Sequence, residues 1–145
     1  AQALLAKAGE KLLLPVDVVV AESLKSETGR ATDVNAIGPA EMALDIGPKT
    51  VQNYGERLRR AKSVLWNGPM GLFESPAFAH GSFGVARAMA DCQGFTVVGG
   101  GDSVAAVQQA GLTDKYTHVS TGGGASLEFL SGLPLPGVEA LDNAP

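Results

Sequence analysis

The chain has 145 residues, of which 45% are apolar, so it has the size of one ordinary domain with a substantial core. Eleven basic and fifteen acidic residues give a net charge of -4, the wrong sign for a protein that binds nucleic acid by neutralising its phosphates. The single cysteine, Cys92, excludes an internal disulfide framework and fits a reducing, cytoplasmic setting, and no apolar stretch is long enough to predict a membrane partner.

The first quarter of the chain is expected to hold a helix end, a buried strand and a loop. Residues 1–9 resemble the last turns of a helix with Gly9 as the stop signal, and a chain that opens inside an element is expected to be a piece of a longer one. Residues 11–21 form a dense aliphatic run that predicts a strand. Residues 23–39 are polar and predict an exposed loop, followed by a short helical turn over residues 39–42.

Strands and helices are then predicted in alternation. A brief extended piece over residues 44–46 leads to an amphipathic helix that begins at Pro48. Further strands are predicted over residues 63–66, 95–98 and 116–120, and further helices from Ser75-Pro76 onward and over residues 104–110 and 125–130. This alternation predicts an α/β fold, a three-layer, Rossmann-like parallel sheet with helices on both faces.

Three glycine-rich turns follow the last three predicted strands: residues 66–71, 99–103 and 120–126. Glycine lets the backbone bring its N–H groups close to a ligand, and each following helix start adds unpaired N–H donors. In a parallel sheet these turns share the edge at the carboxyl ends of the strands, where such folds bind ligands. The sequence therefore predicts one phosphate-binding crevice.

Polar residues in these turns have alternative roles. Asp102 could cap a helix, but beside approachable N–H groups a carboxylate also suits a divalent cation shared with phosphate, and we favour the metal role. Asn67 could donate its amide to a ligand and Glu74 could accept ribose hydroxyls, although either could equally be a cap. No Gly-Lys dipeptide or G-x-G-x-x-G spacing is present, which argues against a P-loop or a standard dinucleotide fold.

The longer motifs resemble those of phosphoglycerate kinase. They are WNGPMGLFE, VVGGGDS, THVSTGGGASLEFL and LPGVEAL, with LLPVDVVVA and LDIGPKT in matching order upstream. The similarity covers essentially the whole chain. It implies an enzyme of glycolysis that moves a phosphoryl group reversibly between 1,3-bisphosphoglycerate and Mg-ADP.

The resemblance also implies how the chain relates to that enzyme. Residues 1–145 correspond to the C-terminal part of its nucleotide-binding domain, so the α/β domain is expected to be incomplete. The N-terminal domain, which takes 3-phosphoglycerate or 1,3-bisphosphoglycerate, has no counterpart here. The full-length enzyme is expected to be a monomer that uses ATP or ADP with Mg²⁺.

Individual roles follow from the matched motifs. The resemblance implies that Leu44 lines the adenine pocket, that Glu74 holds the ribose and that Asp102 binds magnesium. The residues implied to face the nucleotide phosphates are Asn67, Gly100, Gly101, Ser103 and Thr121. The N–H groups of Gly122, Gly123 and Gly124 are implied to stabilise the transferring phosphoryl group and are the catalytic candidates.

The fragment is expected to be inactive alone, because the resemblance implies that an arginine and lysines outside it complete the catalytic site. The alternative function is a non-catalytic nucleotide-binding module or a structural fragment that needs the missing part for activity.

Overall fold

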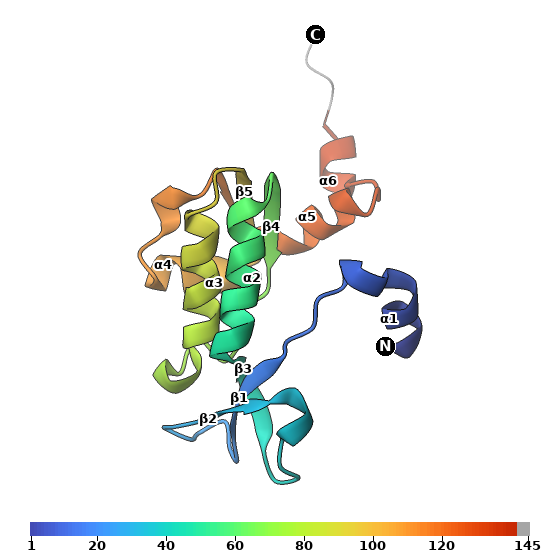
Figure 1. Ribbon diagram of the computed structural model, residues 1–145. Helices are drawn as coiled ribbons and strands as arrows, with labels where there is room; N and C mark the ends of the chain where they lie inside the picture. The colour runs from blue at the N-terminus through green and yellow to red at the C-terminus, as the bar shows by residue number, and fades with distance from the viewer. Residues whose placement is uncertain (142–145) are drawn as a thin grey trace.

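The computed structural model describes residues 1–141 and contains two three-stranded sheets (Figure 1). One sheet is antiparallel with the order β2-β1-β3, and the other is parallel with the order β4-β5-β6. The strands are β1 (Asp17–Ala21), β2 (Arg30–Asp33), β3 (Met42–Ile46), β4 (Ser63–Asn67), β5 (Phe95–Gly99) and β6 (His118–Ser120). The α-helices are α1 (Gln2–Ala8), α2 (Pro48–Arg60), α3 (His80–Ala90), α4 (Gly101–Gln109), α5 (Gly123–Leu130) and α6 (Pro136–Glu139).

The parallel sheet carries the main core on one face. Trp66 of β4 and Val98 of β5 are adjacent in the register, and both are buried against α3 and α4. Met89 of α3 and Val107 of α4 are fully buried in the same cluster. The predicted α/β class, with a parallel sheet flanked by helices, is confirmed.

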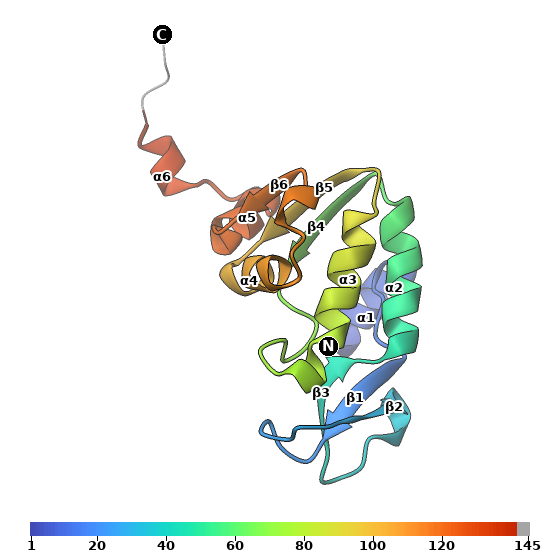
Figure 2. The same cartoon turned by 90° about the vertical axis from the view of Figure 1, so that its left-hand side faces the viewer.

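The opposite face of this sheet is only partly covered. In two views at right angles, β4 and β5 lie between the α2–α3 pair and α5 (Figures 1 and 2). A cleft of about 710 Å³ separates the sheet from α5, and it is lined by Leu65, Phe95, Phe129 and other residues. Phe95 is 54% exposed and Phe129 is 69% exposed. The two faces are therefore unequal: one is a packed core and the other is an open apolar surface.

The antiparallel sheet corrects three expectations for the first third of the chain. The run over residues 11–21 becomes a strand only from Asp17, and this strand lies outside the parallel sheet. Residues 23–39 contain β2, a short and mostly exposed polar strand that lacks the alternating apolar pattern used to predict strands. In place of the helical turn expected over residues 39–42 the structure has a single hydrogen-bonded turn, in which the N–H of Glu41 donates to the carbonyl of Gly38 at 3.0 Å, and Met42 already begins β3.

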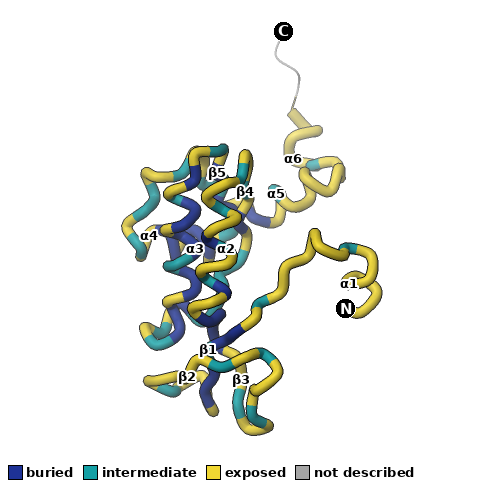
Figure 3. Tube along the Cα trace, viewed as in Figure 1, coloured by how far each residue is buried: buried dark blue, intermediate teal, exposed yellow. Residues whose placement is uncertain are grey.

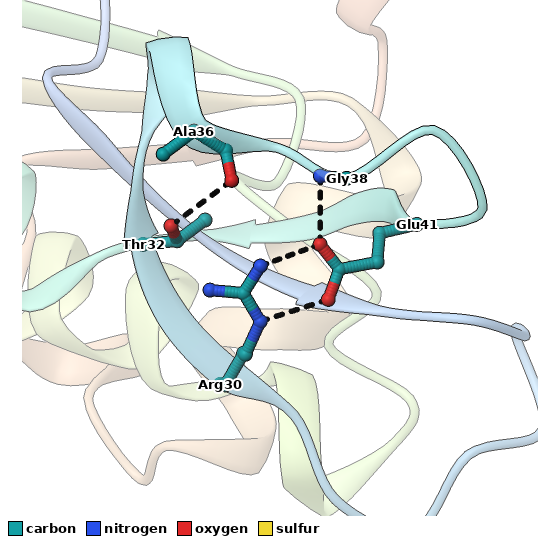
Figure 4. Close-up of polar contacts among 5 residues, drawn as sticks. All are labelled: Arg30, Thr32, Ala36, Gly38 and Glu41. Atoms are coloured by element: carbon teal, nitrogen blue, oxygen red, sulfur yellow. Dashed lines mark hydrogen bonds and ion pairs between the residues drawn. The ribbon is translucent and has the colours of Figure 1, made fainter.

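An ion pair fixes the connection between β2 and β3 (Figure 4). Arg30 donates from Nε and Nη2 to the two carboxylate oxygens of Glu41, at 2.8 and 2.6 Å, and the Gly38 N–H donates to the same carboxylate. Thr32 donates its hydroxyl to the carbonyl of Ala36. Because Arg30 is largely exposed, the pair orders this loop more than it stabilises the fold.

Each helix predicted after residue 47 is present, but three of the four begin at a different residue from the one predicted. The helix at Pro48 begins where expected, whereas Ser75-Pro76 leads into a 3₁₀ turn, η3 (Pro76–Phe78), before α3. Helices α4 and α5 begin two or three residues earlier than predicted, inside the glycine turns. The glycines are thus helical first-turn residues as well as loop residues.

Burial divides the chain unevenly (Figure 3). Helices α1 and α6 have no buried residue, whereas α3 has six. Within residues 1–141, no helix has the length and apolar character needed to cross a membrane.

A buried network joins the antiparallel sheet to α2. The carboxylate of Asp17 accepts hydrogen bonds from the N–H groups of Lys49 and Thr50 and from the Thr50 hydroxyl. Burial alone would raise the pKa of Asp17, but these three donors outweigh it and hold the pKa below its ordinary value of 3.8. The carboxylate therefore satisfies the start of α2 and is most stabilising in its charged form.

Replacing Asp17 should cost stability in a pH-dependent way. A lowered folded-state pKa means that the stabilisation is present above the unfolded pKa and is lost as the pH falls through the folded one. Asp17→Asn should lower the free energy of unfolding by about 1–3 kcal/mol at about pH 7, with the difference shrinking at about pH 3. Urea unfolding of both proteins measures this. The exposed Asp114→Asn serves as control, and a pH-independent deficit in Asp17→Asn would contradict the electrostatic explanation.

Candidate functional site

The three glycine turns meet at one edge of the parallel sheet. Asn67 pairs with Gly99, and Gly99 pairs with Ser120, so the three strands end at the same level. Each of these strands is short and ends within two residues of a following glycine, because glycine favours turns over extended strands. The strand register therefore brings the three turns together at one edge, as the sequence predicts.

Two of the turns touch through their backbones. A Cβ added to Gly123 would lie 2.6 Å from the Cα and 2.7 Å from the nitrogen of Gly100. Gly100 itself has a φ of 92°, which L side chains rarely adopt, and its N–H donates to the carbonyl of Ser120 at 3.2 Å. Only glycine fits both positions without displacing backbone.

Side chains from the first two turns complete the contact. Asn67 donates its Nδ2 amide to the carbonyl of Gly123 at 3.3 Å. Ser103 is fully buried, and its hydroxyl oxygen accepts the N–H of Gly68 at 2.6 Å. Trp66 donates its indole N–H to the carbonyl of Gly68 at 2.7 Å. All three turns are therefore linked by named hydrogen bonds.

The starts of α4 and α5 have no side-chain cap. Gly100 and Gly122 occupy the N-cap positions, and neither helix has a capping hydrogen bond from a side chain. Asp102 lies in the first turn of α4 and is exposed, and it does not cap this helix, because Gly100 occupies the N-cap position and no side chain makes a capping hydrogen bond. Thr121 is exposed, as are Gly101 and Gly124. Two helix N-termini thus lie at this edge with the Asp102 carboxylate in the first turn of α4, a combination suited to an anion and its counter-cation.

A second depression lies beside the turns and brings Leu44 and Glu74 together. This cleft, of about 550 Å³, lies between β3 and the loop of residues 69–74 that follows the first turn. Leu44 forms one wall but is only 7% exposed, and Glu74 is an exposed carboxylate on the other wall. The loop connects this cleft to the turns, because its first residue, Pro69, follows Gly68 directly.

Sequence reasoning missed the residues that hold this loop. The N–H of Leu72 donates to the carbonyl of Leu44 at 2.8 Å, and the N–H of Met70 donates to the hydroxyl of Ser82 at 3.0 Å. Asp45, 3% exposed, accepts the N–H of Gly81 at 2.7 Å. A carboxylate between two buried aliphatic residues in a strand is the one signal that could have identified Asp45 as a partnered, buried group.

Burial raises the pKa of Asp45 above its ordinary value of 3.8, while the N–H groups of Gly81 and Ile46 and the charge of His80 act in the opposite direction. The pKa of Asp45 is higher in the folded chain than in the unfolded chain. The contribution of Asp45 to the free energy of unfolding therefore falls as the pH rises from below the unfolded-state pKa to above the folded-state pKa. The charged form of Asp45 therefore costs folding free energy.

No group of three or more His, Cys, Asp or Glu side chains within residues 1–141 is arranged to hold a metal ion. A protein-only metal centre is therefore not built from these residues. A single carboxylate such as Asp102 still fits magnesium, which is commonly held by one or two carboxylates together with substrate phosphates and water.

The fold is that of an α/β protein whose three glycine turns meet at one edge of a parallel sheet, and comparison with known proteins identifies the family. The family model for phosphoglycerate kinase matches residues 1–133. Phosphoglycerate kinases from Roseiflexus castenholzii and Chloroflexus aggregans are 53% and 55% identical, over 96% and 99% of this chain. This chain spans only 35% and 38% of those two relatives.

Solved structures agree with the sequence matches. The structure of phosphoglycerate kinase from Coxiella burnetii superposes with a TM-score of 0.86 at 43% identity, and that from Pyrococcus horikoshii with a TM-score of 0.85 at 38% identity. These alignments cover 95% and 97% of this chain and 37% and 35% of the solved chains. The chain belongs to the phosphoglycerate kinase family, a family of kinases.

The contact between the second and third turns should tolerate no side chain at Gly123. Gly123→Ala should lower the free energy of unfolding by about 1–3 kcal/mol, because its methyl group meets the backbone of Gly100. Gly124→Ala is the matched control, since a Cβ at the adjacent position meets no atom within 4 Å. Thermal unfolding compares the two. Equal melting temperatures for both variants would contradict the direct contact of the turns.

Proposed function

We propose that this chain supplies the nucleotide and magnesium site for reversible phosphoryl transfer between 1,3-bisphosphoglycerate and Mg-ADP in glycolysis. Family membership supports kinase chemistry, and the whole reaction belongs to a protein of which this chain matches about a third. The observation that carries the proposal is the contact of three glycine turns at one edge, with two uncapped helix starts among them.

The nucleoside part would occupy the cleft between β3 and residues 69–74. In this proposal Leu44 contacts the adenine and the Glu74 carboxylate accepts the ribose hydroxyls. The cleft has apolar walls and one exposed carboxylate, which suits a flat, apolar base attached to a polyhydroxyl sugar.

The phosphates would lie over the turns. The N–H groups of Gly101 and Thr121 and the amide of Asn67 would donate to phosphate oxygens. Gly100 would contribute by allowing close approach, because its own N–H already donates to the carbonyl of Ser120. Ser103 would contribute mainly through the start of α4, because its hydroxyl oxygen already accepts the N–H of Gly68. Gly122, Gly123 and Gly124 would lie next to the transferring phosphoryl group. The Gly124 N–H would be its donor, because the N–H groups of Gly122 and Gly123 already donate to the Ser120 hydroxyl and the Thr121 carbonyl, at 3.2 and 3.1 Å.

Fixed donors of this kind suit the reaction. Phosphoryl transfer through a loose transition state needs alignment and charge neutralisation, and donors on rigid helix starts supply both without reorganising. Asp102 would hold Mg²⁺, which when bound supplies positive charge to the phosphates. The chain's own part is to orient the nucleotide and to keep its donors in place.

The alternative is a nucleotide-binding or structural fragment without catalysis. Its supporting observation is the open apolar face of the parallel sheet, where Phe95 is 54% exposed. A surface of this kind indicates a chain that functions in association with other protein surface.

Calorimetric titration with ADP tests the nucleotide site directly. The chain should bind ADP more tightly with magnesium than without it. Asp102→Asn should weaken Mg-ADP binding about tenfold and metal-free ADP binding less than about twofold, because the carboxylate acts through the cation. Asp114→Asn, also exposed but on the connection before β6, should bind like the unaltered chain. If Asp102→Asn weakened the binding of Mg-ADP and of metal-free ADP equally, Asp102 would not be the residue that holds the metal.

Turnover should be absent from these 145 residues alone. The three glycine turns contain no lysine or arginine, and none lines the cleft between β3 and residues 69–74, so the proposed site lacks the positive side chains that neutralise charge during transfer. A coupled assay of the purified chain, free of any longer kinase, checks this. Sustained ATP formation from 1,3-bisphosphoglycerate and ADP would show that the chain is a complete catalyst.

A further inference from the structure

We propose that Asp45 is a positioning residue for nucleoside recognition: its buried carboxylate sets the separation of the two walls of the cleft between β3 and residues 69–74. This inference rests on the proposed function, because the occupant of that cleft is taken to be the nucleoside of ADP. It assigns no contact between Asp45 and the nucleotide itself.

The first observation is what the carboxylate holds. Oδ2 accepts the N–H of Gly81 at 2.7 Å, at the start of α3, and Oδ1 accepts the N–H of Ile46 at 2.9 Å. One oxygen therefore joins β3 to α3, and the other keeps the side chain folded against its own strand. Asp45 is only 3% exposed, so water does not replace these partners.

The second observation is how closely the opposite wall approaches. A Cβ built on Gly71 would collide with the Asp45 carboxylate and with its Cα, and a Cβ built on Gly81 would collide with the same side chain. The carboxylate thus fills the space between β3 and the loop, and glycine at both positions allows the approach. Two further hydrogen bonds hold the loop on either side of Gly71. The N–H of Leu72 donates to the carbonyl of Leu44, and the N–H of Met70 donates to the hydroxyl of Ser82.

The third observation concerns the free-energy cost of burying the Asp45 carboxylate and its position beside the cleft. A buried carboxylate is expensive, and an apolar residue of similar size would fill a purely structural position at lower cost. Asp45 directly follows Leu44, one wall of the cleft, and lies against Gly71, part of the other wall. A displacement of this contact would therefore move Leu44 relative to Glu74, the two side chains assigned to the base and the sugar.

The test separates nucleoside recognition from phosphate binding and from stability. Asp45→Asn keeps the shape of the side chain but places an amide against the N–H donors. It should weaken Mg-ADP binding about tenfold while changing pyrophosphate binding less than about twofold. Asp17→Asn is the matched control: it alters an equally buried carboxylate that accepts N–H groups at the start of α2. This control should lower stability without changing the ratio of ADP to pyrophosphate affinity.

A second variant keeps the test decisive if Asp45→Asn does not fold. Gly71→Ala leaves the carboxylate in place but pushes the loop away from it, and it should produce the same selective loss of ADP affinity. The inference would be overturned if either folded variant lost affinity for ADP and for pyrophosphate equally. It would also be overturned if the ratio of ADP to pyrophosphate affinity were the same in that variant as in Asp17→Asn.

Hydrogen exchange distinguishes failure of the inference from failure of the proposed function. Asp45→Asn should accelerate exchange of the Gly81 and Leu72 amides, and leave the Thr50 amide as in the unaltered chain. If the unaltered chain binds no ADP but this selective acceleration is seen, the proposed function fails here while the wall-setting role of Asp45 stands. If exchange at Gly81 and Leu72 is unchanged, the role of Asp45 is wrong whatever the chain binds.

Discussion

The structure depends on backbone meeting backbone at Gly100 and Gly123. These two residues come from different turns, and their contact brings the starts of α4 and α5 together at the edge of the parallel sheet. Any side chain between them would separate the two sets of N–H donors. Hydrogen bonds of Asn67 and Ser103 then join the first turn to the other two, so the protein itself holds the three turns of the candidate phosphate site together.

The second half of the chain could be predicted because its signals are local. Short aliphatic strands, glycine turns and helical periodicity follow one another, and each strand was found in the register that places the turns side by side. The antiparallel sheet was missed because β2 is polar and pairs with β1 through partners ten to sixteen residues apart along the chain, from Val20 with Arg30 to Asp17 with Asp33. Single-sequence patterns contain little information about such pairing. The glycines could be recognised in the sequence, but their direct contact could not.

Asp45 illustrates a different limit. In the sequence it is one carboxylate in an apolar strand, and only the folded chain brings it to Gly71 and Gly81, from segments more than twenty-five residues away. Asp17 has the same character, with Lys49 and Thr50 as its partners. Both buried carboxylates lie on strands of the antiparallel sheet and accept N–H groups at or near the start of a helix packed against it. The antiparallel sheet is therefore bonded to the starts of both α2 and α3, and its strand β3 also forms one wall of the cleft beside residues 69–74.

Trp66 gives the site an optical property of its own. It is the chain's single tryptophan, it is 5% exposed, and its indole N–H donates to the carbonyl of Gly68 in the first turn. Gly68 in turn donates to Ser103 at the start of α4. The chain's intrinsic tryptophan emission thus comes entirely from an indole bonded to the candidate phosphate site, so the protein carries a built-in spectroscopic reporter of that turn's conformation.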